Sequence, residues 1–287
     1  MKRIGFVDYF LSEWHANNYP QWIEKNVIDK NREEMKVAYA YALKEVSPYD
    51  NVTTDEWCQK FGVEKVSSLD ELAKKSDYIV ILSPDNPEYH EQFGENVLKY
   101  GKPVFIDKTF APDSESAERI FSIAEKYNTP LYSTSAMRYA PEIESYRKSQ
   151  SPALSAVVNG PYNIEIYGVH LIEIMNTVMK RGGRRLMAVS NTLNRAIIVE
   201  YYNGRRALYN QIEAPHSGFS VAVEKNGQNN FYPITGDSFA GFIDAMLDFF
   251  ETGKVPVEKE DTIEIMKILD AVKTAVKTPY QWIEIRE

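Results

Sequence analysis

Lys108 is the residue whose place in the sequence most clearly suggests chemistry. It follows a short apolar run at residues 104–106 and then Asp107. In an open α/β sheet, ligands bind beyond the carboxyl ends of buried strands, and Lys108 would lie at such an end. Its ammonium can hydrogen-bond a substrate hydroxyl, and its pKa falls readily when the group is desolvated. The alternative is a structural ion pair with Asp107 at the strand end, and the spacing alone favours neither interpretation.

The loop after the first predicted strand is the place to look for a dinucleotide. In such loops, glycines let the backbone approach a pyrophosphate, and the following helix supplies N–H groups and its positive dipole end. Here Asp8, Phe10 and Glu13 stand where those glycines are expected, and the two acids would repel an anion. Ser12 is predicted to cap the following helix. Taken alone, the loop argues against ordinary pyrophosphate binding.

The carboxylate that commonly binds the adenosine ribose is also missing. It is expected near the end of the second strand, but residues 38–44 contain no acid and the first one is Glu45. Lys44 would suit a 2′-phosphate, although a single lysine on a surface turn is usually just solvated.

The first half of the chain alternates between predicted strands and helices. Apolar runs at residues 4–7, 78–82 and 104–106, and a less clean one at 35–42, are typical of strands covered on both faces, as in a parallel sheet. Residues 130–133 are predicted as a further strand. Helix-start signals lie between these runs, namely the capping-box pairs Thr53 with Glu56 and Ser68 with Glu71, then Asn86 before Pro87, and Ser114. This alternation predicts a Rossmann-like, doubly wound α/β domain over residues 1–137.

The second half has a different pattern. β-rich runs flank Asn203-Gly204 and Asn226-Gly227, and Asn-Gly in that setting is a strong hairpin signal. Helices are predicted after His170, over residues 239–250 and over residues 261–276. The expected fold is therefore α/β, with a C-terminal α+β domain over residues 138–287 that contains a mostly antiparallel sheet. We expect the ligand in a crevice between the two domains.

Composition excludes several classes of protein. The chain has 287 residues, of which 44% are hydrophobic and 26% charged, which is ordinary for a globular protein. A net charge of −8 argues against a nucleic-acid partner. The longest apolar run is too short to span a membrane, and no signal peptide is evident. The single cysteine, Cys58, fits a reducing compartment, so a cytoplasmic protein is expected. No ligand spacing predicts a metal site.

Three segments, in the same order, resemble the glucose-fructose oxidoreductase/inositol dehydrogenase/MocA family. The first segment contains Ser83-Pro84, then His90, then residues 101–108 (Gly-Lys-Pro-Val-Phe-Ile-Asp-Lys). It is similar to the family's Thr-Pro-Asn with a nearby His, which is followed by Gly-Lys-His-Val and then Glu-Lys-Pro. Residues 133–141, with Arg138-Tyr139-Ala140-Pro141, resemble its Asn-Arg-Arg-Phe-x-Pro stretch, and residues 168–173 its Gly-Val-His-Leu-Ile-Asp segment. With the final helices included, the resemblance covers essentially the whole chain.

The resemblance implies an NAD(P)-dependent oxidoreductase that transfers a hydride to or from a hydroxyl-bearing carbon of a sugar, polyol or related small molecule. Lys108 matches the family's catalytic lysine and His170 its catalytic histidine, a suitable general base because imidazole titrates near neutral pH. The residues expected to bind NAD or NADP are Asp8, Tyr9, Phe10, Leu11, Ser12, Ser83, Pro84, Asp107 and Lys108. Those expected at the substrate are His90, Arg138, Tyr139 and Glu165.

The chain also departs from the family pattern. The family's aspartate four residues before the histidine is Ile166 here, with Glu165 beside it. If residues 165–170 are extended, these two side chains point to opposite faces, and Glu165 does not substitute without a bulge. The family's proline after the lysine is Thr109, which lacks the ring that makes cis peptide bonds common. The stretch between Pro141 and His170 is shorter than is usual in the family.

Several alternatives stay open. The protein could be a catalytically inactive relative that senses a metabolite or nucleotide, or an enzyme that uses its dinucleotide for elimination or glycoside cleavage. Without the flanking match, His170 would be interpreted as packing against the sheet. Packing at a domain interface is an equal alternative for Arg138 and Tyr139, and His216 is interpreted as a surface-loop residue. A homodimer or tetramer is expected through an exposed face of the C-terminal sheet, with Tyr201, Tyr202 and Tyr209 as contact residues.

Overall fold

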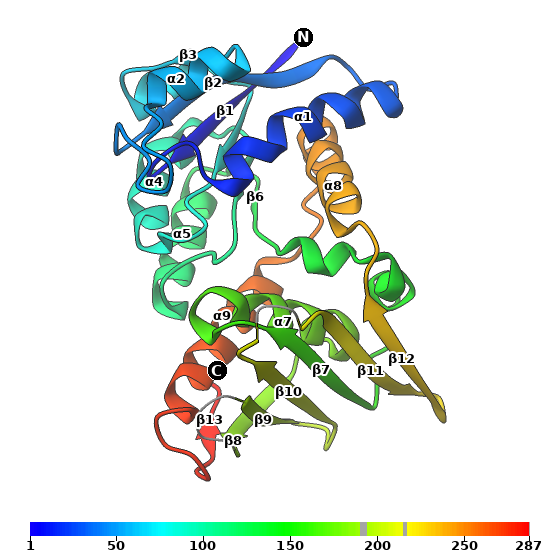
Figure 1. The fold of residues 1–287 in the computed structure, drawn as a ribbon. Coiled ribbons are helices and arrows are strands. Elements are labelled where there is room, and N and C mark those ends of the chain that lie inside the picture. Colours follow the sequence, from blue (N-terminus) through cyan, green and yellow to red (C-terminus); the bar gives the residue numbers. More distant parts are fainter. Residues whose placement is uncertain (190–193, 215–216, 287) are drawn as a thin grey trace. The chain divides into compact units, whose positions relative to one another are not determined.

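The computed structural model describes residues 1–189, 194–214 and 217–286, and the chain divides into two compact units. The first unit contains Met1–Ser133 and Ile243–Lys259, and the second contains Thr134–Phe242 and Glu260–Glu287 (Figure 1). The first break lies close to the boundary predicted between residues 137 and 138. Residues 243–259, however, belong to the first unit, whereas the sequence placed them in the second domain. His216 lies outside the described residues.

The first unit is built on a parallel sheet. Its elements are β1 (Lys2–Asp8), α1 (Trp14–Asp29), β2 (Met35–Ala42), α2 (Thr54–Phe61), β3 (Glu64–Lys65), α3 (Leu69–Lys75), β4 (Tyr78–Ile81), α4 (His90–Val97), β5 (Val104–Ile106), α5 (Ser114–Lys126) and β6 (Leu131–Tyr132). The strand order is β3-β2-β1-β4-β5-β6, which is the order of the doubly wound dinucleotide-binding fold. The predicted Rossmann-like sheet is confirmed, and its topological switch point lies between β1 and β4.

Part of α8 (Ser238–Thr252) belongs to the first unit, where ion pairs and ring contacts hold it. Arg32, just after α1, forms ion pairs with Asp244 at 2.7 Å and Asp248 at 2.6 Å. The ring of Tyr78 in β4 stacks on that of Phe250 with centroids 4.8 Å apart. These contacts join residues that are far apart in the sequence, so the local patterns used to set the predicted boundary did not reveal them.

The predicted helix starts are confirmed at Thr53 and Ser68, whose side chains accept backbone N–H bonds from the first turns of α2 and α3. Asn86 makes no such bond, and a 3₁₀ turn precedes α4. Helix α5 is capped by Asp113 rather than by Ser114, because the Asp113 carboxylate reaches a backbone N–H of the first turn.

The second unit contains a seven-stranded mixed sheet. Its elements are α6 (Glu144–Lys148), β7 (Ser155–Pro161), α7 (Ile164–Met179), β8 (Gly183–Ala188), β9 (Asn194–Tyr201), β10 (Arg206–Ile212), β11 (Phe219–Lys225), β12 (Gln228–Ile234), α9 (Lys259–Ala275) and β13 (Ile283–Glu284). The strand order is β12-β11-β7-β10-β9-β8-β13, and every described pair except β7 with β10 is antiparallel. The mostly antiparallel α+β fold and both Asn-Gly hairpins are confirmed.

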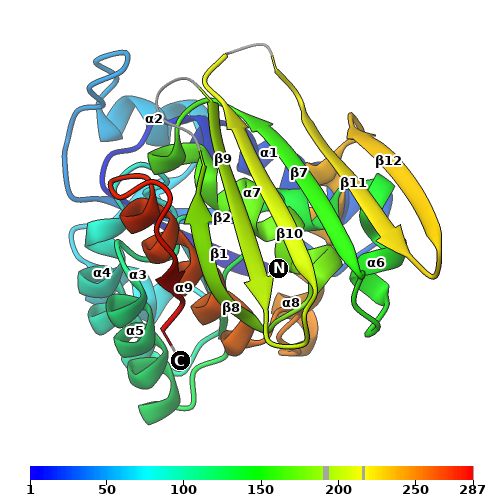
Figure 2. The same cartoon turned by 90° about the horizontal axis from the view of Figure 1, so that it is seen from below.

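Helix α7 packs closely on one face of this sheet, and Figure 2 shows it behind the strands. Gly160 in β7 permits the close approach, because a Cβ there would lie 2.5 Å from Leu171 Cδ1. The helix starts earlier than the sequence predicted, six residues before His170. Asn163 caps it by accepting the backbone N–H of Ile166 at 3.0 Å.

Candidate active site

Lys108 lies directly beyond β5, where the sequence placed it. Only 7% of its surface is exposed, and its backbone N–H donates to Asp107 Oδ1 at 2.8 Å. The other carboxylate oxygen of Asp107 lies 3.1 Å from Nδ1 of His15. The peptide bond between Lys108 and Thr109 is cis, although threonine replaces the family's proline. One oxygen of the Asp107 carboxylate is thus hydrogen-bonded to the backbone of Lys108, and the other lies within ion-pair distance of an imidazole.

His170 lies in the second turn of α7 and is half-buried. Its Nδ1 is 2.6 Å from the hydroxyl oxygen of Ser135, which also accepts the backbone N–H of Met137 at 3.1 Å. The rings of Tyr167 and Phe219 meet the imidazole edge-on, with centroids 5.4 and 5.9 Å away. The ring is therefore held at one nitrogen and packed on its sides, as a positioned general base requires.

The segment before His170 is helical, so the expectation built on an extended chain is wrong. On a helix, residues four apart share a face, which places Ile166 on the face of His170. Glu165 is exposed in the first turn. The group that lies next to the imidazole of His170 is the hydroxyl of Ser135. Sequence reasoning missed Ser135, although it lies inside the segment 133–141 that carried the resemblance.

Arg138, which the sequence assigned to the substrate, is buried inside the second unit. Its guanidinium forms an ion pair with Glu173, one turn beyond His170, and donates to Asn176 Oδ1 at 2.9 Å. Glu173 also accepts the hydroxyl of Thr134 at 2.9 Å. Arg138 and Glu173 therefore fix the segment that carries Ser135 onto α7, and the assignment of Arg138 to the substrate is corrected.

Tyr139 is also placed in the interior of the second unit. It is buried, with the Arg147 guanidinium 5.0 Å from its ring centroid and the Phe242 ring edge-on at 6.3 Å. A substrate contact for Tyr139 does not fit this packing.

His90 is fully buried in the first unit, so the expectation that it faces a cleft or solvent is wrong. Its Nδ1 lies 3.0 Å from the carbonyl oxygen of Phe110, and its Nε2 lies 2.6 Å from that of Leu82. Burial lowers the pKa of His90 below its ordinary value. His90 thus connects α4 to the segments that follow β4 and β5, and this placement does not bring it to a substrate.

The loop after β1 is closed by Asp8, one of the residues expected at the cofactor. Asp8 Oδ1 accepts the backbone N–H of Tyr9 at 2.7 Å, and the N–H and hydroxyl of Ser83 at 3.0 and 3.1 Å. Pro84 follows Ser83 and is half-buried. The Asp8 carboxylate therefore bridges the ends of β1 and β4, at the switch point where doubly wound sheets bind ligands. Burial, and then the charge of Glu13, raise the pKa of Asp8 well above its ordinary value.

Helix α1 begins with a carboxylate of the chain itself. Glu13 is its N-cap, and the carboxylate accepts the backbone N–H of His15 at 2.7 Å and that of Ala16. Ser12, the predicted cap, instead donates its hydroxyl to Asp50 at 2.7 Å. N–H groups at a helix start are the ones that bind a phosphate in this fold. The residues present therefore do not fit a pyrophosphate in this conformation.

The aromatic residues of the same loop pack on neighbouring loops of the first unit. Tyr9 stacks on Tyr89 with ring centroids 4.4 Å apart, and Phe10 meets Tyr49 edge-on at 5.2 Å. Phe10 and Leu11 are buried. Tyr49 and Tyr89 follow β2 and β4, so Tyr9 and Phe10, which were expected at a dinucleotide, connect these loops.

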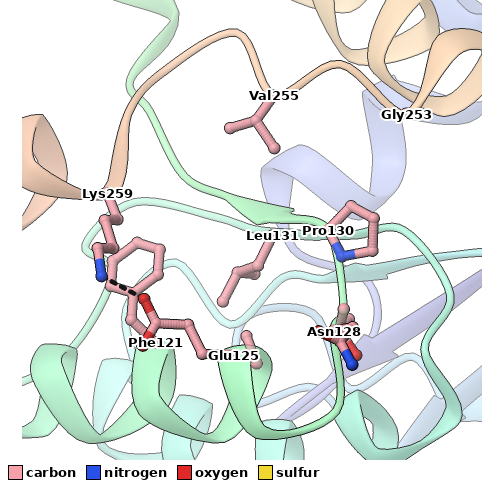
Figure 3. Close-up of a pocket in the computed structure, with 10 residues that line it drawn as sticks. Phe121, Glu125, Asn128, Pro130, Leu131, Gly253, Val255 and Lys259 are labelled. Carbon is pink, nitrogen blue, oxygen red and sulfur yellow. Dashed lines mark hydrogen bonds and ion pairs between the residues drawn. The ribbon is translucent and has the colours of Figure 1, made fainter.

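A groove elsewhere on the first unit contains none of the expected site residues. It has a volume of about 580 Å³ and lies between α5, the start of β6 and residues 253–259 (Figure 3). An ion pair joins Glu125 and Lys259 at its edge. Since the groove adjoins the amino end of β6 and Lys108 follows the carboxyl end of β5, the groove and the lysine lie at opposite ends of the sheet.

Three further observations concern the described residues as a whole. They contain no helix that is both long enough and apolar enough to cross a bilayer. They contain no group of three or more His, Cys, Asp or Glu side chains arranged to hold a metal ion. Burial raises the pKa of the Cys58 thiol to about 11, so this cysteine is a poor nucleophile at neutral pH.

Comparison with known families defines the class of the first unit. Residues 23–135 match a family model described as "Oxidoreductase family, NAD-binding Rossmann fold". The match includes Lys108 and begins after the loop that contains Asp8 and Glu13. Over these residues the chain is similar to that family of NAD-binding oxidoreductases, and the predicted resemblance to the glucose-fructose oxidoreductase/inositol dehydrogenase/MocA family is confirmed. No curated protein matches the chain.

Solved structures share the fold of the whole chain. A probable dehydrogenase from Thermotoga maritima has a TM-score of 0.81 at 12% identity, covering 99% of this chain and 98% of its own. GenD2 from gentamicin A biosynthesis, solved with NAD, has a TM-score of 0.79 at 13% identity, covering 100% and 97%. UDP-N-acetylglucosamine 3-dehydrogenase from Acidithiobacillus ferrooxidans has a TM-score of 0.78 at 14% identity, covering 98% and 99%. At such identities the likeness shows the fold.

Proposed function

We propose that the protein is an oxidoreductase that uses NAD or NADP to oxidise or reduce a hydroxyl-bearing carbon of a sugar, polyol or related small molecule. The observation that carries the proposal is Lys108, an almost buried ammonium beyond the carboxyl end of β5 within the segment that matches the oxidoreductase family. The substrate class is supported by the similar fold of a nucleotide-sugar dehydrogenase.

In this proposal His170 takes the hydroxyl proton of the substrate as the alcohol is oxidised, and returns it in the reverse direction. Ser135 holds Nδ1 of the imidazole, so proton exchange takes place at Nε2. Lys108 donates a hydrogen bond to the same substrate oxygen and stabilises the charge that develops on it. The bound nicotinamide supplies the hydride chemistry. Lys108 and His170 belong to different units, and the proposal requires them to act on one substrate.

The proposal is tested with a panel of sugars and polyols, each assayed with NAD and with NADP by the absorbance of the reduced nicotinamide. We expect turnover of at least one substrate, and a loss of about 10²-fold or more in Lys108→Ala. Lys99→Ala, an exposed lysine of the same unit, serves as the matched control and should keep full activity. The proposal is contradicted if neither nucleotide binds at millimolar concentration and no substrate is turned over.

A second function, ligand sensing without turnover, is favoured by one specific observation. The Glu13 carboxylate occupies the N–H groups at the start of α1 that would bind a phosphate. A sensor predicts that Lys108→Ala leaves ligand affinity nearly unchanged and that no substrate is converted, so turnover that disappears in this variant rejects it. Product formed without net change in reduced nicotinamide would indicate elimination or glycoside cleavage instead.

We also propose that the chain forms homodimers or tetramers through the outer face of the second unit's sheet, which faces the viewer in Figure 2. A row of apolar side chains crosses this face from strand to strand, each in register with the next: Phe231, Ala222, Val157, Leu208, Ile198 and Met187. Contiguous apolar side chains on an exposed sheet face are typical of an interaction site.

The residues beside this row suit a self-complementary contact. On one side Asn159 and Asn210 are hydrogen-bonded to each other at 2.9 Å, and on the other side Arg185 pairs with Glu200 at 2.6 Å. Of the three tyrosines expected at the contact, Tyr202 is exposed. Tyr209 and Tyr201 are buried on the inner side of the sheet, which corrects the prediction for these two residues.

A further inference from the structure

The start of α1 has an arrangement that the proposed function does not explain. A buried carboxylate of the chain occupies the position where a doubly wound fold binds a phosphate. We propose that Glu13 is an internal substitute for the pyrophosphate, and that a dinucleotide binds only after it displaces this carboxylate from the helix start. The proposal rests on the proposed function, because it concerns the same cofactor.

The geometry of Glu13 shows the substitution directly. The residue is 4% exposed, and its two carboxylate oxygens accept the N–H groups of His15 and Ala16. These donors belong to the first turn, where the helix dipole also favours a negative charge. An N–H group that donates to Glu13 is not available to a phosphate. One anion therefore has to replace the other.

The charges around Glu13 point in the same direction. His15 Nδ1 lies 3.5 Å from Glu13 and 3.1 Å from Asp107, so one imidazole serves two buried carboxylates. Asp8 is buried beside them, and its Oδ2 has no hydrogen-bond partner among the described residues. A pyrophosphate would add negative charge to this acidic cluster. Binding is therefore unfavourable while Glu13 keeps its place.

The backbone of the loop nevertheless keeps the form of a glycine turn. Ser12 has φ of +66°, in the left-handed region that favours glycine. Glu13 itself is extended, with φ of −109° and ψ of 174°. The obstacle is consequently in the side chains rather than in the path of the chain. Removing the Glu13 carboxylate should restore donors that the backbone already positions.

The test measures binding and does not depend on turnover. Isothermal titration gives the Kd of NADH, NADPH and adenosine diphosphate ribose, which carries the pyrophosphate without nicotinamide. The proteins compared are the wild type, Glu13→Ser, Glu13→Gln and Glu24→Gln. Serine keeps an N-cap hydroxyl without the charge, and glutamine keeps the shape without the charge. Glu24 is exposed on the same helix and provides the matched control.

We expect at least tenfold tighter binding of all three ligands to Glu13→Ser than to the wild type, a smaller gain in Glu13→Gln and no change in Glu24→Gln. Binding to Glu13→Ser that equals or falls below a measurable wild-type affinity would overturn the inference and leave the proposed function intact. Absence of binding in every protein would overturn both. Thermal melting of each variant checks its folding, and if Glu13→Ser fails to fold, the result with Glu13→Gln decides.

Discussion

At the scale of single residues, Asp8 contributes to the dependence of the first unit's stability on pH. Its folded-state pKa is raised above the unfolded value of 3.8 by burial and then by Glu13, so the folded state binds the proton more readily than the unfolded chain. The stability linked to this proton is fully present below the unfolded pKa and is lost as the pH rises through the folded pKa.

Asp8→Asn should therefore stabilise the protein at neutral pH, by about 1–3 kcal/mol. The asparagine oxygen still accepts from Tyr9 and Ser83, while the buried charge is gone. Thermal melting across pH should show the gain over the wild type shrinking as the pH falls. Asp29→Asn, at an exposed position of α1, is the control. A variant less stable than the wild type at every pH would contradict this account of Asp8.

Ser135 is a positioning residue, because it acts through His170. Ser135→Ala removes the hydroxyl 2.6 Å from Nδ1, and we expect kcat to fall about tenfold or more while KM changes little. Ser135→Thr keeps a hydroxyl and should recover most of the loss. A purely structural role would instead lower the melting temperature without this separation of kcat from KM.

The candidate site was predictable where a residue and its neighbours in the chain were sufficient to identify its structural position. Lys108 follows an apolar run that could only be a buried strand, and the structure has it there. The pairing of Arg138 with Glu173 joins residues 35 positions apart, and a single amino-acid sequence gives no sign of such a contact. Residue type alone does not distinguish an arginine in a buried ion pair from one that binds a ligand, so Arg138 was assigned to the substrate.

At the scale of elements, the contact between β7 and α7 fixes the helix that carries His170. A Cβ at Gly160 would lie 2.5 Å from Leu171 Cδ1 and 3.0 Å from Phe219 Cδ1. Gly160→Ala should destabilise the protein by about 1–3 kcal/mol in urea unfolding, because the buried core must shift. Gly218→Ala is the matched control, since a Cβ added there has no atom of the described residues within 4 Å. Equal stability of the two variants would show that α7 is not held by this contact.

Elements were predicted well where their signals are local. Continuous apolar runs identified the parallel strands, and the Thr53 capping box identified α2. The start of α7 was missed because Ile164-Glu165-Ile166 alternates as a strand would, while Asn163 caps a helix there. The cap of α1 was missed because glutamate is not among the preferred N-cap residues, so Ser12 was chosen over Glu13.

At the scale of the whole molecule, the apolar row on the outer face of the second unit's sheet should control assembly. Val157 lies in this row and is 38% exposed, as is Val255 in the first unit. Light scattering should show a dimer or tetramer for the wild type and for Val255→Asp, and a monomer for Val157→Asp, because an unpaired charge inside an apolar contact is costly. A monomeric wild type would contradict the proposed contact.

The division of the chain could be predicted only in part. The change from apolar runs to Asn-Gly hairpins predicts a boundary between residues 137 and 138, and the observed break follows Ser133. The return of residues 243–259 to the first unit depends on Arg32 and Tyr78, more than 170 positions earlier in the chain. Local patterns cannot report such pairings, because each partner alone resembles an ordinary surface arginine or core tyrosine.

The most direct test of the central claim is a double-mutant cycle on kcat/KM with Lys108→Ala, His170→Ala and the combined variant, using the substrate found in the panel. If both residues act on one substrate oxygen, their effects are strongly non-additive, and the combined variant loses about as much as the more damaging single change. Losses that multiply as for independent sites, or single variants that keep full activity, would contradict the claim.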